Sequence, residues 1–270
     1  MTTSYYEDIP YPYPSPIQKR LDNCLSFGIT GIIELLPSGL IGKSPHPRAS
    51  PYSRDSMRKH LLREYEVYQR LPTHDRLIEM IEYSGDGTLI LDYMPFGNLR
   101  EYLKLNRAVI TLPQRLQWCI DAAEAVQVVH SHSIIHCDIK PENFLLGPEP
   151  RLRIIDFSGS SIDGKPPYVL ENTRFFLPRS RDDELPCSVI TDLFALGSSI
   201  YEIITGEQPH VNLGDKEVEA RYKRQEFPIV DGMSCGEIIK KCWMGEFNSA
   251  KAVEAALEVE MRKYNFTTTS

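Results

Sequence analysis

Two short polar segments, each flanked by apolar residues, carry the side chains that could do chemistry. The first is His136-Cys137-Asp138-Ile139-Lys140-Pro141-Glu142-Asn143, and Asp156-Phe157-Ser158 follows eighteen residues after Asp138. In phosphoryl transfer from ATP, one aspartate orients the acceptor hydroxyl and a lysine neutralises charge on the phosphoryl group, while an asparagine and a second aspartate hold Mg²⁺. Asp138, Lys140, Asn143 and Asp156 supply this set in order, so they predict an ATP- and Mg²⁺-dependent phosphotransfer site.

Both segments resemble the catalytic and metal-binding loops of the eukaryotic protein kinase family, and the resemblance covers most of the chain. The run from Asp138 to Asn143 has the serine/threonine-kinase spelling, and His-Cys-Asp with Asp-Phe-Ser is most similar to fungal kinase-like proteins. The resemblance implies an α+β, two-lobed fold, with a small N-terminal antiparallel β-sheet lobe that has one helix and a larger, mainly α-helical C-terminal lobe. It also implies transfer of the γ-phosphate of ATP to serine or threonine hydroxyls of proteins. Asp138 would be the base, Lys140 the γ-phosphate contact, and Asn143 and Asp156 the magnesium ligands.

The resemblance extends to the residues that hold the phosphates of ATP. Lys43 matches the strand lysine that contacts the α- and β-phosphates, and Glu64 matches its partner on the following helix. Glu66 is the second candidate for the partner of Lys43, because its side chain would point about 200° around the helix from that of Glu64. Taken alone, Lys43 would be interpreted as an exposed loop lysine, but together with the motifs that follow it the phosphate-binding role is favoured.

Ser26 to Ile33 resembles the glycine-rich loop that covers the phosphates, with serine in place of the first glycine. Gly28 and Gly31 would let backbone N–H groups approach phosphate without a Cβ in the way. An ordinary β-turn with two glycines is the alternative interpretation of this segment. The resemblance also implies an adenine pocket, in which the backbone of Asp92 and Met94 forms the hinge. The apolar residues predicted around adenine are the gatekeeper Leu91, the floor residue Leu145, and Ile33 and Ile41.

The elements that must position these residues follow from apolar periodicity and turn residues. Residues 25–43 predict three short strands and residues 77–94 two more, which together make a five-stranded sheet. Apolar residues at 57, 61, 65 and 68 predict one helix over residues 57–71, after a loop at 46–53. Residues 112–132 and 189–204 predict helices. Residues 163–188 predict a long loop, and a loop of that length inside a compact domain is usually functional or mobile.

Composition and charge limit the compartment and the partners. The net charge of −7 and the pI of about 5.6 argue against nucleic acid or an anionic membrane as a partner. The six scattered cysteines lack metal-ligand spacing and indicate reduced thiols. The start of the chain does not read as a signal peptide, and residues 189–204 are too short and too charged to span a bilayer. We therefore expect a cytoplasmic or nuclear protein.

The domain organisation expected from the sequence is a single kinase-like unit. It covers residues 18–264, with an N-lobe at about 18–94 and a C-lobe at about 95–264. A flexible leader rich in proline and tyrosine covers residues 1–17, and a polar tail covers residues 265–270. The protein substrate and the oligomeric state do not follow from the sequence.

Three positions depart from the family pattern, and a fourth matches a structural residue. Cys137 replaces the arginine that pairs with a phosphorylated activation loop, so we expect activity without such phosphorylation. Ser158 replaces a glycine, which restricts the metal loop. Leu177-Pro178-Arg179 replaces Ala-Pro-Glu, and no arginine after the late tryptophan matches the usual partner of that glutamate. Asp192 matches the buried helix aspartate that holds the catalytic-loop backbone.

Two other functions are compatible with these residues and their spacing. A pseudokinase would keep the fold, with or without nucleotide binding, as a binding or scaffold module, and the altered Leu177-Pro178-Arg179 region favours this interpretation. A small-molecule phosphotransferase of the aminoglycoside-kinase type shares the aspartate and asparagine spacing, but such enzymes usually lack the insert seen at Lys140-Pro141-Glu142. The retained set of charged residues favours the protein kinase.

Overall fold

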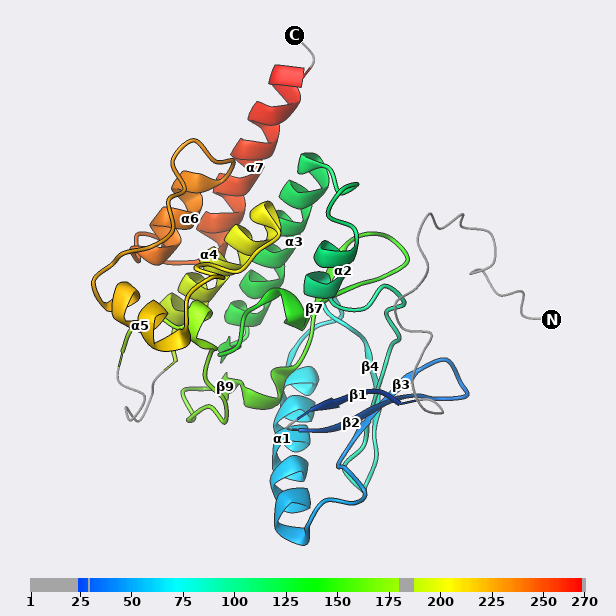
Figure 1. Ribbon diagram of the computed structural model, residues 1–270. Helices are drawn as coiled ribbons and strands as arrows, with labels where there is room; N and C mark the ends of the chain where they lie inside the picture. Colours follow the sequence, from blue (N-terminus) through cyan, green and yellow to red (C-terminus); the bar gives the residue numbers. More distant parts are fainter. Residues whose placement is uncertain (1–23, 29, 180–186, 269–270) are drawn as a thin grey trace, which may run out of the picture.

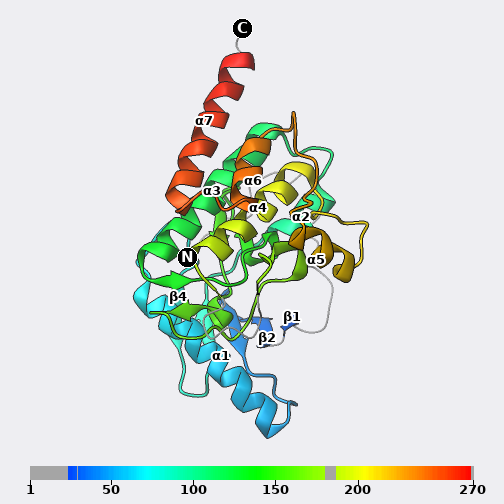
Figure 2. The same ribbon diagram turned by 90° about the vertical axis from the view of Figure 1, so that its left-hand side faces the viewer.

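A five-stranded sheet with one long helix forms the smaller part of the molecule, and helices form most of the larger part (Figure 1). The computed structural model describes residues 24–28, 30–179 and 187–268, so the expected leader at residues 1–17 lies outside the described residues. Seen from a second direction, α1 (Pro51–Arg70) and the end of α7 (Ala250–Thr268) still lie at opposite ends of the molecule (Figure 2). The two-lobed α+β fold expected from the sequence is confirmed.

The sheet of the N-lobe is antiparallel throughout, with strand order β1-β2-β3-β5-β4. Its strands are β1 (Cys24–Gly28), β2 (Gly31–Leu35), β3 (Ile41–Ser44), β4 (Met80–Tyr83) and β5 (Leu89–Leu91). The register pairs Lys43 with Ile33 on one side and with Leu89 on the other. Lys43 therefore lies on the central strand, where both neighbours fix its backbone.

Helix α1 begins earlier than the periodicity of its apolar residues predicts. Ser50 caps it, because its side chain accepts a hydrogen bond from the Ser53 amide at 3.1 Å, and Pro51 occupies the first turn. The expected start at residue 57 was wrong, as was the expected loop over residues 51–53. The exposed first turn contributes little to the apolar pattern, so Ser50 and Pro51 are the sequence signals there.

The C-lobe is built around α3 and α4. Its helices are α2 (Leu99–Leu105), α3 (Leu112–Ser131), α4 (Val189–Thr205), α5 (Asp215–Lys223), α6 (Gly236–Trp243) and α7. Its strands and short 3₁₀ helices are β6 (Ile134–Ile135), η1 (Pro141–Asn143), β7 (Phe144–Leu146), β8 (Leu152–Ile154), η2 (Phe157–Gly159), β9 (Ser161–Ile162) and η3 (Thr173–Phe175). Helix α3 packs against α7 and α4, and α4 packs against α6. Helix α7 runs to Thr268, so it continues into the stretch expected as a polar tail.

Helix α4 has clear end signals and a buried body. Ser188 and Thr191 form a reciprocal capping box at its start, and Gly206 ends it with a φ of 81°. Leu193 and Leu196 are almost fully buried. Asp192 is 0% exposed in this apolar helix, so its carboxylate needs polar partners within the protein.

Candidate active site

A buried lysine between two carboxylates joins the lobes. Lys43 Nζ lies 2.6 Å from Glu64 Oε2 on α1 and 2.8 Å from Asp156 Oδ1 of the metal loop. Glu66 instead has a largely exposed side chain and lies 3.6 Å from Arg63. The structure thus brings Lys43 together with Glu64, the partner ranked first, and with Asp156. Their roles toward nucleotide stay predictions.

Burial and neighbouring charges have opposite effects on the pKa values of Lys43, Glu64 and Asp156. Burial raises the pKa of Glu64 to about 7, although Lys43 opposes the shift. Burial would also raise the pKa of Asp156, but Lys43 outweighs it and holds that pKa well below its usual range. Burial would lower the pKa of Lys43, yet Asp156 and Glu64 raise it above its ordinary value. Lys43 and Asp156 are therefore charged at neutral pH.

The catalytic loop folds back on itself around Asp138. Lys140 Nζ donates to Asp138 Oδ2 at 2.6 Å, and Asn143 Nδ2 donates to the Asp138 main-chain oxygen at 2.8 Å and to Oδ2 at 3.0 Å. Asp138 Oδ1 is buried and has no hydrogen-bond partner among the described residues. Burial raises the pKa of Asp138 above its ordinary value, against the opposing effect of Lys140. The loop therefore leaves one carboxylate oxygen of Asp138 without a hydrogen bond among the described residues.

The Asp192 carboxylate on α4 binds the backbone of the catalytic loop. Its carboxylate accepts hydrogen bonds from the amides of His136 at 2.8 Å and Cys137 at 3.0 Å, and His130 Nε2 lies 2.9 Å from it. Cys137 has a positive φ of 66°, so these bonds stabilise a backbone conformation that a non-glycine residue rarely adopts. His136 Nε2 contacts the Ile155 carbonyl at 3.0 Å, which joins the catalytic loop to the metal loop. These contacts give His136 and Asp192 structural roles.

Asn143 and Asp156 fit a hard divalent cation in the types of their donor atoms. The Ile155 amide donates to the Asn143 carbonyl at 3.0 Å, so the two residues lie on adjacent stretches of backbone. The Asn143 side-chain nitrogen is used by Asp138, which leaves its amide oxygen for another partner. The Asp156 side chain is 34% exposed, and its Oδ1 accepts hydrogen bonds from Lys43 Nζ and Ser158 Oγ. Amide and carboxylate oxygens are ligands that Mg²⁺ accepts.

Ser158 acts on the metal loop through its hydroxyl. Ser158 Oγ donates to Asp156 Oδ1 at 2.8 Å, and the serine is buried within η2. The positive φ in this loop falls on Asp156, at 65°, and not on Ser158. A serine is thus accommodated without backbone strain, and it adds a hydrogen bond that a glycine lacks.

The predicted adenine contacts lie along the junction of the two lobes. Leu91 ends β5 and is 6% exposed, and Met94 follows it with 5% exposed. The Met94 carbonyl accepts from the Gly97 amide at 3.2 Å, so it takes part in the turn that leads into α2. Leu145 on β7 forms a bridge with Asn98, directly beyond this turn. The structure brings Leu91, Met94 and Leu145 to one connection between the lobes.

The remaining predicted nucleotide contacts lie in the sheet. Ile33 and Ile41 lie on β2 and β3, Asp92 follows β5, and Gly28 pairs with Gly31 at the hairpin between β1 and β2. A Cβ on Gly31 would come within 2.1 Å of the Ser44 carbonyl oxygen, at a φ of +150°. Gly31 is therefore required by the close approach of two strands, whether or not the hairpin covers phosphate.

Sequence reasoning missed Glu171. Arg179 occupies the place of the usual glutamate, and its Nη2 lies 2.6 Å from Glu171 Oε2, whose side chain is 0% exposed. The Arg179 guanidinium also lies 4.2 Å from the centre of the Phe176 ring. An ion pair within the segment thus provides Arg179 with a buried partner. The reversal of charge at position 179 was the signal that a nearby acid should be sought.

The fold and the site define a class of protein. A sheet lobe and a helical lobe meet at the contact of Lys43 with Glu64 and Asp156, and a loop of the helical lobe carries the hydrogen-bonded pair Asn143 and Asp138; these are the residue types that phosphotransfer from a nucleotide uses. The sequence model of the protein kinase domain family matches residues 49–252. The chain belongs to the protein kinase family, and its match covers α1 through the beginning of α7.

The individual relatives include proteins from animals that are named as Aurora kinases. The chain is 29% identical over 195 residues to Aurora kinase C of Mus musculus, covering 69% of the chain and 68% of that protein. It is 32% identical over 184 residues to Aurora kinase A-A of Xenopus laevis, covering 62% of the chain and 42% of that protein. It is 28% identical over 180 residues to Aurora/IPL1-related protein kinase 2 of Caenorhabditis elegans, covering 65% of the chain and 58% of that protein. The resemblance to fungal proteins stays a prediction.

The described residues contain no helix with the length and apolarity needed to cross a bilayer. The expected cytoplasmic or nuclear location stays a prediction.

Proposed function

We propose that this chain is an ATP- and Mg²⁺-dependent protein kinase that phosphorylates serine or threonine hydroxyls of proteins. The observation that supports this function best is the position of Lys43 between Glu64 and Asp156. A protein kinase needs its lysine–glutamate pair and its metal-binding aspartate in place at the same time. The Aurora relatives, which are named as kinases, add independent support.

Each charged residue has a distinct part in the proposed reaction. Lys43 would hold the α- and β-phosphates, and Asn143 and Asp156 would hold Mg²⁺, which neutralises charge on the phosphates when bound. Asp138 Oδ1, which is buried without a partner among the described residues, would accept the hydrogen bond of the acceptor hydroxyl and orient its oxygen. Lys140, now 2.6 Å from Asp138, would turn toward the transferred phosphoryl group.

The acceptor class can be tested directly. Purified protein with γ-labelled ATP and Mg²⁺ should label a mixture of polypeptides, and hydrolysis of the products should give phosphoserine or phosphothreonine. Asp138→Ala should abolish this labelling. Labelling of small alcohols without labelling of protein would favour a small-molecule phosphotransferase. Binding of Mg-ATP with no transfer to any acceptor would favour a pseudokinase.

A further inference from the structure

The hydroxyl of Ser158 lies against the carboxylate that would bind the metal ion. Ser158 Oγ donates to Asp156 Oδ1 at 2.8 Å, and Lys43 Nζ donates to the same oxygen at 2.8 Å. A carboxylate oxygen accepts through two lone pairs, so both acceptor sites of Oδ1 are taken. Asp156 Oδ2 receives no hydrogen bond within the part of the chain that the structure describes, and the side chain is 34% exposed. Oδ2 is thus the oxygen left for a ligand.

The backbone that carries Ser158 is held in place by helix α1. His60 Nδ1 lies 3.2 Å from the Ser158 carbonyl, and Arg63 donates to the Ser160 carbonyl at 2.6 Å. Ser158 is 3% exposed, so its side chain is surrounded by packed atoms. The Ser158 hydroxyl is therefore a fixed donor to Asp156 and not a mobile surface group.

Ser158 and Lys43 differ in the other contacts that they make. The Lys43 ammonium has three donors, of which Glu64 and Asp156 take two, and its predicted role directs the third to a phosphate. The Ser158 hydroxyl has a single donor, and Asp156 Oδ1 accepts it. Ser158 can therefore keep Oδ1 in place while Lys43 also engages a nucleotide.

The hydrogen bond from Ser158 has two opposite effects on cation binding. A donor draws charge from the carboxylate, which weakens the attraction for a cation, but the full positive charge of Lys43 on the same oxygen already dominates this effect. The donor also fixes the orientation of the carboxylate, so less ordering is needed when a cation binds. The second effect is usually the larger, because loss of a hydrogen-bond partner of a metal ligand typically weakens metal affinity by about 10- to 100-fold.

We propose that Ser158 is a positioning residue for the divalent cation. Its hydroxyl holds Asp156 Oδ1, so that Oδ2 is the oxygen offered to the metal ion. The proposal rests on the proposed kinase function. Mg²⁺ is usually bound by one or two carboxylates together with substrate phosphates, so the effect of Ser158 belongs to the complex with nucleotide and metal.

The test is calorimetric binding of an ATP analogue that cannot transfer its γ-phosphate, with and without saturating Mg²⁺. The ratio of the two affinities reports how strongly the protein-bound nucleotide holds the metal, relative to free nucleotide. Ser158→Ala and Ser158→Gly should each lower this ratio by about 10-fold, while the affinity without metal stays within about 2-fold of wild type. Ser160→Ala is the matched control, because its buried hydroxyl donates to the His136 carbonyl at 3.2 Å and not to Asp156. It should keep the wild-type ratio.

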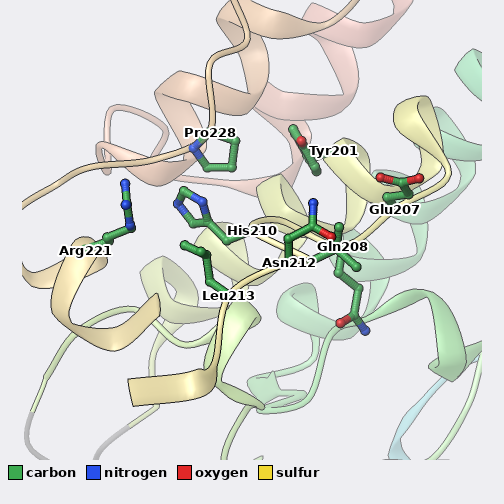
Figure 3. A pocket seen from close by; sticks show the side chains of 9 residues that line it. Tyr201, Glu207, Gln208, His210, Asn212, Leu213, Arg221 and Pro228 are labelled. Atoms are coloured by element: carbon green, nitrogen blue, oxygen red, sulfur yellow. The ribbon is translucent and has the colours of Figure 1, made fainter. Parts of the chain in front are cut away.

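A cation bound elsewhere on the chain would not imitate this effect. Among the described residues, no group of three or more histidine, cysteine or acidic side chains is placed to hold a metal ion. Glu207 and His210 line a C-lobe cavity of about 390 Å³, but they lie apart in it (Figure 3), and none of its lining residues is assigned to the nucleotide. A change in the affinity ratio is therefore specific to the predicted metal site.

The outcomes separate this inference from the proposed function. If Mg²⁺ promotes binding of the analogue to wild type and to both Ser158 variants equally, Ser158 does not position the metal ligand and the kinase function stands. If wild type does not bind the analogue with Mg²⁺ at all, the kinase function itself fails. Ser158→Gly, which carries the family's usual residue, keeps the test decisive if Ser158→Ala does not fold.

Transfer kinetics provide a second readout. Ser158→Ala should need about 10-fold more Mg²⁺ for the half-maximal rate, while the rate at saturating Mg²⁺ stays within about 2-fold of wild type. A rate that is lower by the same factor at every Mg²⁺ concentration would show a general structural role and would overturn the proposal.

Discussion

At the scale of single residues, the site depends on charges that are buried together. Lys43 is 7% exposed, and its partner Glu64 is 1% exposed. Removal of one member of such a group leaves the others buried without compensation, which is more damaging than loss of an exposed pair. The same residue that would bind phosphate therefore also stabilises the contact between sheet, helix and metal loop.

Lys43→Met should weaken both nucleotide binding and folding. We expect Mg-ATP to lose its stabilising effect on thermal unfolding, and the free energy of unfolding to fall by about 3 kcal/mol, because Glu64 stays buried. Lys59→Met, on the exposed face of α1, is the matched control and should behave as wild type. Retention of a full Mg-ATP shift by Lys43→Met would contradict the assigned role.

Glu171 should make stability depend on pH. Burial raises its pKa to about 7 from an ordinary 4.5, although Arg179 opposes the shift. The folded chain thus holds this proton more tightly than the unfolded chain, so the contribution of Glu171 to stability is complete below about pH 4.5 and is lost as the pH rises to about 7. The buried Glu64 shifts in the same direction and titrates in wild type and variant alike.

Denaturant unfolding of wild type and Glu171→Gln at several pH values measures this contribution. Between pH 4.5 and 7, wild type should lose up to about 3 kcal/mol relative to Glu171→Gln. Glu217→Gln, an exposed carboxylate on α5, should show no such change relative to wild type. A difference between wild type and Glu171→Gln that stays constant with pH would mean that Glu171 titrates normally.

At the scale of elements, α1 is fixed to the metal loop by contacts along its length. His60 Nδ1 lies 3.2 Å from the Ser158 carbonyl, Arg63 donates to the Ser160 carbonyl at 2.6 Å, and the ring centres of Tyr68 and Phe157 are 5.3 Å apart. These contacts keep Glu64 opposite Lys43 without any phosphorylated residue. The following segment is held by its own ion pair between Glu171 and Arg179.

Activity should therefore be independent of phosphorylation in that segment. Cys137, which stands where the family has an arginine, is fully buried, and its thiol donates to the Ile135 carbonyl at 3.3 Å, so it offers no positive charge to a phosphate. Treatment of the purified protein with phosphatase should leave the rate of transfer within about 2-fold of the untreated rate. Loss of transfer after removal of all phosphate, confirmed by mass spectrometry, would contradict this expectation.

At the scale of the whole molecule, the two lobes share one connected site. Besides Lys43 and Asp156, the segment before β4 joins the lobes, because the Ile154 amide donates to the Arg76 carbonyl at 2.9 Å and Leu77 forms a bridge with Ile154. Arg76 Nη1 in turn donates to the Leu152 carbonyl at 3.1 Å. The residues predicted to act in phosphotransfer thus lie where the backbones of the two lobes meet.

Much of this arrangement could be predicted from the sequence because its signals are local. The glycines between residues 28 and 42 mark the turns between the strands that position Lys43. Asp138 to Asn143 lie on a single loop, and their residue types are compatible with few other functions. Such patterns need no knowledge of distant contacts. They support the fold and the main charged residues.

Other features depend on contacts between segments and could not be read from local patterns. The pairing of Glu171 with Arg179 requires the fold of a segment without periodicity, and the first turn of α1 is marked only by Ser50 and Pro51. Gly31 is predicted to lie in the phosphate loop, and the structure adds a second requirement for glycine there, the close approach of the Ser44 carbonyl on the neighbouring strand. In each case the residue that determines the local structure is distant in the sequence or does not contribute to the hydrophobic pattern.

The most direct test of the account is the initial rate of γ-phosphate transfer to protein by wild type and Asp138→Asn at saturating Mg-ATP. The substitution keeps the size of the side chain but removes the carboxylate that would orient the hydroxyl. We predict that transfer falls by at least about 100-fold while Mg-ATP affinity, measured by calorimetry, changes little. Equal transfer rates for the two proteins would show that Asp138 is not the catalytic base.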